Sequence, residues 1–233
     1  HVKRNRNIGS ILLIAAGLLL IAAALYELIP VLLAYKRADD TYEALREAYM
    51  TGQPGTSSDD PAEEGEELPA WYEALQVDFE TLKEANPDVI GWIYFDNIEQ
   101  INYPILYSGD DETYLHTDLY GNASKSGCIF MEGNNVPDFN DCHTILYGHN
   151  MKNGTMFSDL KKYLNTDFLN SHRTVRLETA DSVFLFTVTE VRRTNTADPW
   201  YDRTTCEDGR QIILSTCYGS GKDGRLLIIA AES

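Results

Sequence analysis

The chain begins with its longest run of hydrophobic residues. Residues 8–25 carry no charge, follow a basic flank that holds Lys3, Arg4 and Arg6, and are extended beyond Glu27 by residues 28–35. A stretch of this length can span a bilayer, and the basic flank predicts a cytoplasmic N-terminus with the rest of the chain outside. We therefore expect residues 1–34 to form a cytoplasmic tip and a transmembrane anchor.

A cleaved signal peptide is the alternative to an anchor. Residues 22–24 are Ala-Ala-Ala, which fits a small-residue cleavage site, although the apolar run is longer than a typical signal-peptide core. In both cases the remainder of the chain is exported.

Residues 35–70 change in character halfway. The first part, to Met50, has helical composition, whereas residues 51–69 contain six acids, three prolines, three glycines and no base. Such a segment repels itself and has too little apolar surface to fold alone. We expect a helical stalk followed by a flexible acidic linker.

From residue 71 onward the pattern is mostly that of short strands. Leu75, Phe79 and Leu82 recur at helical spacing within residues 71–86, and residues 154–165 indicate one further helix. Apolar runs separated by Gly, Asn and Asp turns predict strands. These runs cover residues 89–95, 101–106, 127–131, 144–148, 174–178, 182–191, 210–217 and 225–231. The pattern favours a mainly β, closed barrel over residues 71–233, with a helical extension at its start.

The charge of the chain limits its partners. The formal net charge is −17, and residues 1–50 are nearly balanced, so the exported part is acidic. An acidic surface disfavours nucleic acid and anionic lipid as partners.

The four cysteines stand at Cys128, Cys142, Cys206 and Cys217. They could form two disulfides, but there is no CxxC pair and no Cys/His cluster of the zinc type, so we expect neither a metal nor a cofactor. In an exported protein an unpaired thiol is a liability unless it has a use, which makes each cysteine a candidate nucleophile.

Histidine is the usual partner of a nucleophilic thiol. His116 and His172 lie in polar stretches and are expected to be solvent-exposed, and His143 is expected at a strand edge or surface. His149 differs, because it follows a strand and opens a turn rich in Gly and Asn. Loops at strand ends are where a barrel presents side chains to a cleft.

Cys217 ends one apolar strand and Arg225 begins the next, after a seven-residue turn. Antiparallel pairing of these strands would bring the guanidinium close to the sulfur, where it could stabilise the oxyanion of a tetrahedral intermediate. The alternative is a surface salt bridge from Arg225 to Asp223 or Glu232.

Three short motifs, taken together, resemble a known family. They are "YGHN" at residues 147–150, "LSTC" at 214–217 and "GR" at 224–225. In this combination the sequence resembles the sortases, the cysteine transpeptidases of Gram-positive cell surfaces. Residues 103–132 and 145–163 are similar to class B sortases in particular.

The resemblance implies a sortase-type β-barrel, in which His149, Cys217 and Arg225 take the family's catalytic positions. The cysteine would attack the Thr carbonyl of a C-terminal sorting signal, often of NPxTN type, to give a thioacyl enzyme. His149 would protonate the leaving amine and then deprotonate an incoming peptidoglycan amine, and Arg225 would hold the carbonyl oxygen.

The flanking residues that could bind substrate are Tyr147, Asn150, Ser215, Thr216 and Trp200. The first four could equally satisfy backbone groups at strand ends.

The sequence departs from the class B pattern. Ile213 stands where the family usually has Thr, the turn between Cys217 and Arg225 is short, and residues 188–217 leave no room for the helical insertion that class B enzymes usually carry before the cysteine strand.

Three other readings remain open. Pilin-polymerising sortases carry a lid with an Asp-Pro-aromatic tripeptide, and residues 198–200 match it between late strands. Residues 124–131 faintly resemble the motif of L,D-transpeptidases, with Cys128 as nucleophile. A surface-binding barrel with a relic site is the third.

Overall fold

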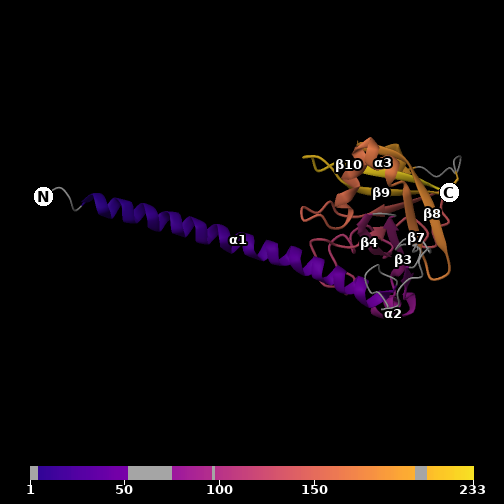
Figure 1. Ribbon diagram of the computed structural model, residues 1–233, viewed down its shortest axis with the longest axis horizontal. Helices are drawn as coiled ribbons and strands as arrows, with labels where there is room; N and C mark the ends of the chain where they lie inside the picture. Colours follow the sequence, from indigo (N-terminus) through magenta and orange to yellow (C-terminus); the bar gives the residue numbers. More distant parts are fainter. Residues whose placement is uncertain (1–4, 52–74, 96–97, 203–208) are drawn as a thin grey trace, which may run out of the picture.

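The computed structural model describes residues 5–51, 75–95, 98–202 and 209–233. One long helix, α1 (Asn5–Tyr49), projects from a β-rich body and carries the N-terminus far from it (Figure 1). The elements that follow are β1 (Met50–Thr51), β2 (Gln76–Val77), α2 (Phe79–Ala85), β3 (Val89–Phe95), β4 (Ile98–Leu106), β5 (Ile129–Met131), β6 (His143–Tyr147), η1 (Phe157–Leu164), α3 (Thr166–Ser171), β7 (Thr174–Glu178), β8 (Val183–Asn195), η2 (Pro199–Asp202), β9 (Gln211–Cys217) and β10 (Gly224–Glu232).

Helix α1 joins the expected anchor and the expected stalk without a break. Its segment Gly9–Tyr49 is long and apolar enough to cross a membrane, and the large apolar side chains from Ile11 to Leu33 are exposed. Residues 52–70, which include most of the expected acidic linker, lie outside the described residues.

The C-terminal end of α1 packs against the barrel. Tyr42 and Leu45 are buried, and the Tyr42 hydroxyl donates a hydrogen bond to the carbonyl of Gly127 at 2.6 Å. The Tyr42 ring also meets Tyr103 edge-on, with 5.1 Å between centroids. The last turns of the helix are therefore fixed to the body.

Helix α2 is shorter than the predicted helix over residues 71–86. Asp78 caps it, its carboxylate accepting from the amide of Thr81 at 3.0 Å, and Gln76–Val77 pairs instead with Met50–Thr51 as β2. Phe79 and Leu82 are buried as the helical spacing predicted, but Leu75 is buried ahead of the helix. Residues 71–74 lie outside the described residues.

The fold class predicted from the sequence is confirmed. Eight strands close a barrel in the order β10-β8-β7-β3-β4-β5-β6-β9, and all eight coincide with predicted runs. The predicted internal helix forms as the 3₁₀ helix η1. A second helix, α3, follows it, and the Asn165 side chain caps the first amides of α3. The sequence analysis missed α3.

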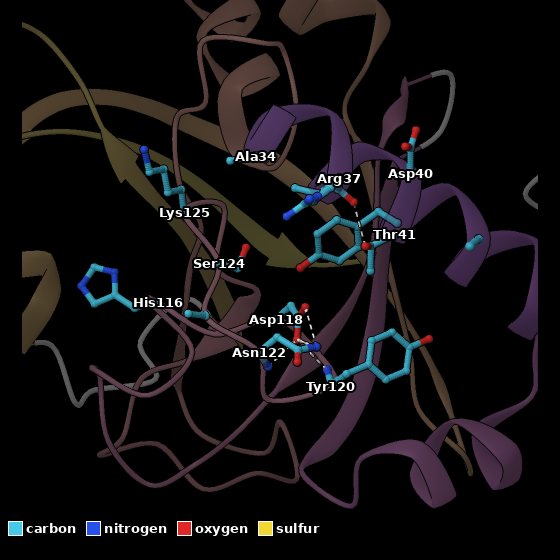
Figure 2. A pocket seen from close by; sticks show the side chains of 14 residues that line it. Ala34, Arg37, Asp40, Thr41, His116, Asp118, Tyr120, Asn122, Ser124 and Lys125 are labelled. Carbon is cyan, nitrogen blue, oxygen red and sulfur yellow. Dashed lines mark hydrogen bonds between the residues drawn. The ribbon is translucent and has the colours of Figure 1, made fainter. Parts of the chain in front are cut away.

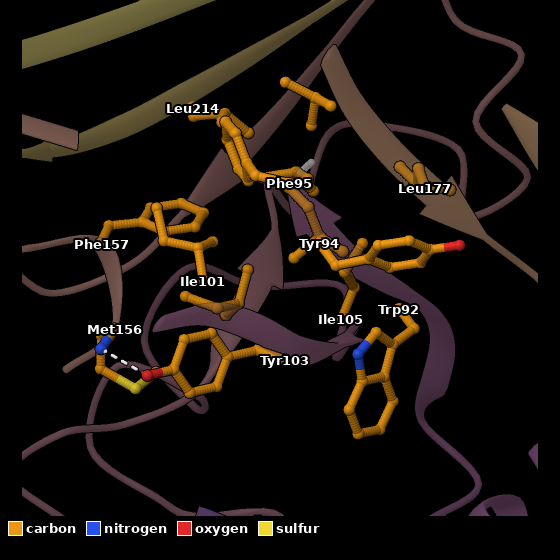
Figure 3. Packing of buried hydrophobic residues seen from close by; sticks show 14 of the residues in the cluster. Trp92, Tyr94, Phe95, Ile101, Tyr103, Ile105, Met156, Phe157, Leu177 and Leu214 are labelled. Carbon is orange, nitrogen blue, oxygen red and sulfur yellow. Dashed lines mark hydrogen bonds between the residues drawn. The ribbon is translucent and has the colours of Figure 1, made fainter. Parts of the chain in front are cut away.

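Two hydrophobic clusters pack against the barrel. The larger one fills the barrel interior and extends outside it to buried residues of α1 and α2, and its members include Trp92, Phe95 and Tyr103 (Figure 3). The smaller one joins Ile145, Ile213, Leu227 and Ile229 of β6, β9 and β10 to Trp200 of η2. Because β9 and β10 contribute to both clusters, they are covered on both faces, which explains their continuous apolar sequences.

Candidate active site

The parallel pairing of β6 with β9 brings two of the predicted residues to one edge of the barrel. Tyr147 is in register with Ser215, and the amide of Gly148 donates to the Ser215 carbonyl at 3.2 Å. His149 and Cys217 each come two residues later in the chain, at adjacent strand ends. Parallel strands present their carboxyl ends at the same edge, so the pairing itself places these side chains near each other.

The third predicted residue arrives through the neighbouring strand. β10 runs antiparallel to β9, and Arg225 is in register with Cys217. His149, Cys217 and Arg225 line one cavity of about 400 Å³.

Strand alternation decides on which face of the barrel this cavity opens. Along β9, Ile212 and Leu214 belong to the inner cluster, whereas Ile213 belongs to the cluster on the other face. Ser215 and Cys217 continue the second series, since side chains two apart share a face. The cavity therefore lies on the outer face, beyond the end of the smaller cluster.

Two glycines permit the close packing that the site requires. A Cβ added at Gly148 would lie 2.5 Å from the Ile129 side chain and 2.6 Å from the Phe157 ring. A Cβ at Gly224 would lie 2.1 Å from the Tyr218 carbonyl oxygen. The glycines beside His149 and Arg225 are thus dictated by the close approach of neighbouring atoms.

His149 is half-buried, and a hydrogen bond determines which of its ring nitrogens carries a proton. Its Nε2 lies 2.9 Å from the carbonyl oxygen of Leu115. A carbonyl can only accept, so Nε2 carries the proton of this hydrogen bond. In the neutral ring Nδ1 is then the atom available for proton transfer.

Hydrogen bonds tie the two strand ends together. The Asn150 amide donates to the carbonyl of Cys217 at 2.9 Å, and the Thr216 hydroxyl donates to the carbonyl of Gly148 at 2.7 Å. Both side chains satisfy backbone groups, which is one of the two roles left open by the sequence.

Arg225 is anchored at one end of its guanidinium. Its Nη1 donates to the carbonyls of Lys222 and Gly224, each at 3.0 Å. Glu232 pairs with Arg210, and no ion pair of Arg225 occurs among the described residues. The remaining N–H groups of Arg225 can serve a ligand in the cavity.

The cysteines differ in their chemistry. Cys217 is free and exposed, whereas Cys128 is free but buried, and its thiol donates to the Thr117 carbonyl at 3.3 Å. Burial raises the pKa of Cys128 to about 12, so it remains a neutral thiol and is a poor nucleophile. Cys142 is disulfide-bonded, and Cys206 lies outside the described residues. Within the described ranges, no group of His, Cys, Asp or Glu is arranged to hold a metal ion.

The other histidines only partly follow expectation. His116 is exposed as predicted, with its ring centroid 6.4 Å from that of His149. His172 is half-buried and stacks on Phe168, and His143 is buried, with Nε2 at 3.0 Å from the Gln211 side-chain oxygen. The predictions of an exposed His172 and a surface His143 were wrong, because helix α3 and η2 provide aromatic cover that the local sequence did not reveal.

Helix η2 forms one wall of the cavity. Trp200 is buried in the smaller hydrophobic cluster and does not line this cavity, but Tyr201 does. The Tyr201 hydroxyl lies 2.7 Å from that of Ser215, and its ring stacks at 6.5 Å on Tyr147. The sequence analysis named Trp200 as a substrate-binding candidate and missed Tyr201, the next residue. The adjacent pair of aromatic residues was the signal that could have indicated it.

Three carboxylates line the cavity and were also missed. They belong to Asp111, Glu132 and Asp202. Glu132 accepts from the Tyr147 hydroxyl at 3.1 Å, and burial, aided by the charges of Asp111 and Asp202, raises its pKa. The residues come from segments far apart in the sequence, so no local pattern joins them.

Asp198 holds η2 in place. Its buried carboxylate accepts from the Trp200 amide at 3.0 Å, from Arg192 Nε at 2.8 Å and from the Thr194 hydroxyl. Burial alone would raise the pKa of Asp198, but these hydrogen bonds outweigh it and lower the pKa.

We expect Asp198→Ala to lower the free energy of unfolding by about 2 kcal/mol at pH 7, because buried donors lose their acceptor. A lowered pKa contributes stability above the unfolded-state value of about 3.9, so the deficit should shrink as the pH falls below about 4. Urea unfolding at several pH values measures this, with Asp181→Ala in the exposed turn after β7 as control. A deficit that does not change with pH would contradict the ionised role of Asp198.

Comparison with known proteins agrees with this fold. A model of the sortase domain matches residues 93–233, and the chain belongs to the sortase family. Over 154 residues it is 39% identical to sortase B of Listeria monocytogenes, a match that covers 61% of this chain and 62% of that protein. The match thus spans less than two thirds of the relative's length.

Solved structures show the same likeness. A crystal structure of sortase B from Bacillus anthracis aligns with 86% of this chain and 98% of its own, with a TM-score of 0.63 and 26% identity. A Staphylococcus aureus sortase B–substrate complex aligns with 66% of this chain and 84% of its own, with a TM-score of 0.58 and 27% identity. The class B resemblance predicted from the sequence is confirmed.

Proposed function

We propose that the protein is a membrane-anchored cysteine transpeptidase of the sortase B type. The observation that carries this proposal is the pairing of β6, β9 and β10, which puts His149, Cys217 and Arg225 on one cavity. Acyl transfer through a thioester needs a nucleophilic thiol, a group that transfers protons and a donor to the oxyanion. The exposed thiol, the histidine whose Nε2 is already hydrogen-bonded and the partly anchored guanidinium can fill these roles.

The proposed reaction has two halves. The Cys217 thiolate attacks the Thr carbonyl carbon of a sorting signal, and the peptide C–N bond breaks while protonated His149 gives its proton to the departing amine. A peptidoglycan amine then attacks the thioester, His149 takes a proton from it, and the C–S bond breaks to restore the thiolate. Arg225 stabilises the oxyanion in both tetrahedral intermediates.

The residues around the triad take different parts in this proposal. Tyr147, Ser215 and Thr216 line the cavity and would contact the peptide, and Asn150 and Thr216 also tie the strand ends together. Trp200 would act indirectly, by supporting the η2 wall that carries Tyr201.

The proposed setting is the outer face of a Gram-positive cell membrane. The exposed apolar surface of α1 supports a single membrane span, and the basic N-terminal flank supports a cytoplasmic N-terminus. The substrates would be surface proteins with a C-terminal sorting signal, joined to a cell-wall amine.

Intact-mass spectrometry of the full chain in detergent tests the proposal. Incubated with NPxTN-type peptides of varied sequence, the protein should gain the mass of the fragment that ends at Thr, and added amine should release that fragment as an amide. Cys128→Ser should form the same adduct. A protein whose exposed thiol alkylates normally but never acylates with any peptide would contradict the proposal.

Arg225→Lys is expected to lower kcat/KM for peptide cleavage by about 10²-fold. Lysine keeps the charge but loses the planar fork, one part of which Arg225 uses to hold the turn. Steady-state kinetics with a fluorogenic sorting peptide measures this, and Arg173→Lys, an exposed arginine away from the cavity, is the matched control. An equal loss in both variants would argue against a role in transition-state stabilisation.

A further inference from the structure

A second, larger cavity lies between α1 and the barrel. It has a volume of about 980 Å³ and is formed by residues 34–44 of α1 on one side and the loop residues 116–125 on the other (Figure 2). It shares no residue with the catalytic cavity. The contacts of Tyr42 with Gly127 and Tyr103 hold the helix beside the loop, so the space between them is part of the fold.

Two cations, Arg37 and Lys125, line this cavity together with two carboxylates, Asp40 and Asp118. In Figure 2, Arg37 from α1 and Lys125 from the loop stand with Ser124 between them, and Asp40 lies on the far side of Arg37. Neither Arg37 nor Lys125 forms an ion pair with any described residue. The Asp118 carboxylate keeps its charge, but it is turned toward its own turn, where it accepts from the backbone amides of Tyr120 and Asn122.

Ser124 adds a donor to the two charges. Its hydroxyl oxygen accepts from the Ser126 amide at 3.2 Å, which leaves its O–H free to donate outward. A guanidinium, an ammonium and a hydroxyl donor are the groups that bind phosphate oxygens. Their concentration at one opening is notable in a chain whose net charge is −17.

The position of the cavity along α1 indicates where the phosphate would come from. The exposed apolar side chains of the helix end at Leu33, and the cavity begins at Ala34. Arg37 lies four residues beyond Leu33, about 6 Å along the helix axis. With the apolar segment in a bilayer, this is the depth of the lipid headgroups.

We propose that this cavity binds the phosphate of an anionic lipid headgroup in the outer leaflet, through Arg37, Lys125 and Ser124. The inference rests on the membrane anchor in the proposed function, but not on the transpeptidation chemistry. It differs from the expectation drawn from overall charge, since juxtamembrane cations can attract anionic lipid locally even in an acidic chain.

Native mass spectrometry of the full chain in detergent tests this, with short-chain phosphatidylglycerol, phosphatidylcholine and inorganic phosphate as separate probes. The wild type should bind phosphatidylglycerol at least tenfold more tightly than the other two. Arg37→Gln/Lys125→Gln should weaken this binding by about 30-fold. The matched control is Lys36→Gln/Lys83→Gln, which removes the same charge from exposed positions outside the cavity and should bind as the wild type does.

Three outcomes would overturn the inference. They are equal binding of the two lipids, inorganic phosphate binding as tightly as phosphatidylglycerol, and an equal loss in the control variant, which would indicate only general charge attraction. Acylation by the sorting peptide is measured in the same preparations. Normal acylation without lipid selectivity would refute this inference alone, whereas selective lipid binding without acylation would refute the transpeptidase alone.

Discussion

Cys217→Ala is expected to form no acyl adduct with any sorting peptide and to lower the rate of peptide cleavage by at least about 10⁴-fold. No other described thiol can replace it, because Cys142 is disulfide-bonded and Cys128 is buried with its pKa raised to about 12. Intact-mass spectrometry and a fluorogenic cleavage assay measure the two effects.

The stability of this variant separates lost chemistry from lost structure. The Cys217 side chain is exposed at the end of β9, so its removal should change the free energy of unfolding by no more than about 0.5 kcal/mol. An adduct that persists in Cys217→Ala would place the nucleophile at another cysteine. Loss of the adduct together with a large loss of stability would make the variant uninformative about the nucleophile, and Cys217→Ser would then replace it.

The barrel could be predicted because its strands are separated by strong turn signals. All eight runs of apolar residues became strands, and the errors concern ends, such as β8 continuing to Asn195 instead of stopping at Val191. The helix predicted over residues 71–86 forms only as α2, and it is shorter for a non-local reason, since Gln76 and Val77 pair with residues that directly follow α1. No periodicity within the segment contains that information.

The motifs around His149, Cys217 and Arg225 marked these residues as candidates, and the structure brings all three to one cavity. The parallel register of β6 with β9 that does so is a property of the closed barrel and could not be predicted. The walls of the cavity were harder to foresee. Tyr201 and Glu132 reach it from segments far apart in the sequence, and each is held at the cavity by a hydrogen bond, Glu132 to Tyr147 and Tyr201 to Ser215.

The surroundings of Cys128 and of the Asp-Pro-Trp tripeptide bear on the alternative functions. An L,D-transpeptidase with Cys128 as nucleophile would require a reactive thiol where the structure buries a neutral one. The Asp-Pro-Trp tripeptide leads into η2 beside the barrel, where Asp198 caps the short helix and Trp200 packs in the smaller hydrophobic cluster. A packing role for the tripeptide accounts for its residues without invoking a lid.

His149→Gln is expected to lower the rate of acylation by about 10³-fold while leaving the fold intact. Glutamine can still donate to the Leu115 carbonyl, which now receives the proton on Nε2, so the local hydrogen bond has a substitute. It has no titrating nitrogen to replace Nδ1, and proton transfer to the leaving amine is lost. Pre-steady-state mass spectrometry with one equivalent of peptide measures the acylation step directly.

A second measurement distinguishes proton transfer from positioning. Added imidazole should restore part of the activity of His149→Gln, because it can supply the missing acid and base in a cavity of about 400 Å³. His172→Gln, which changes a histidine stacked on Phe168 away from the cavity, should acylate at the wild-type rate. Full activity of His149→Gln would show that the amine leaves without help from this ring. The proton would then have to come from solvent or from the carboxyl of Glu132. The raised pKa of Glu132 makes it the next candidate among the residues that line the cavity.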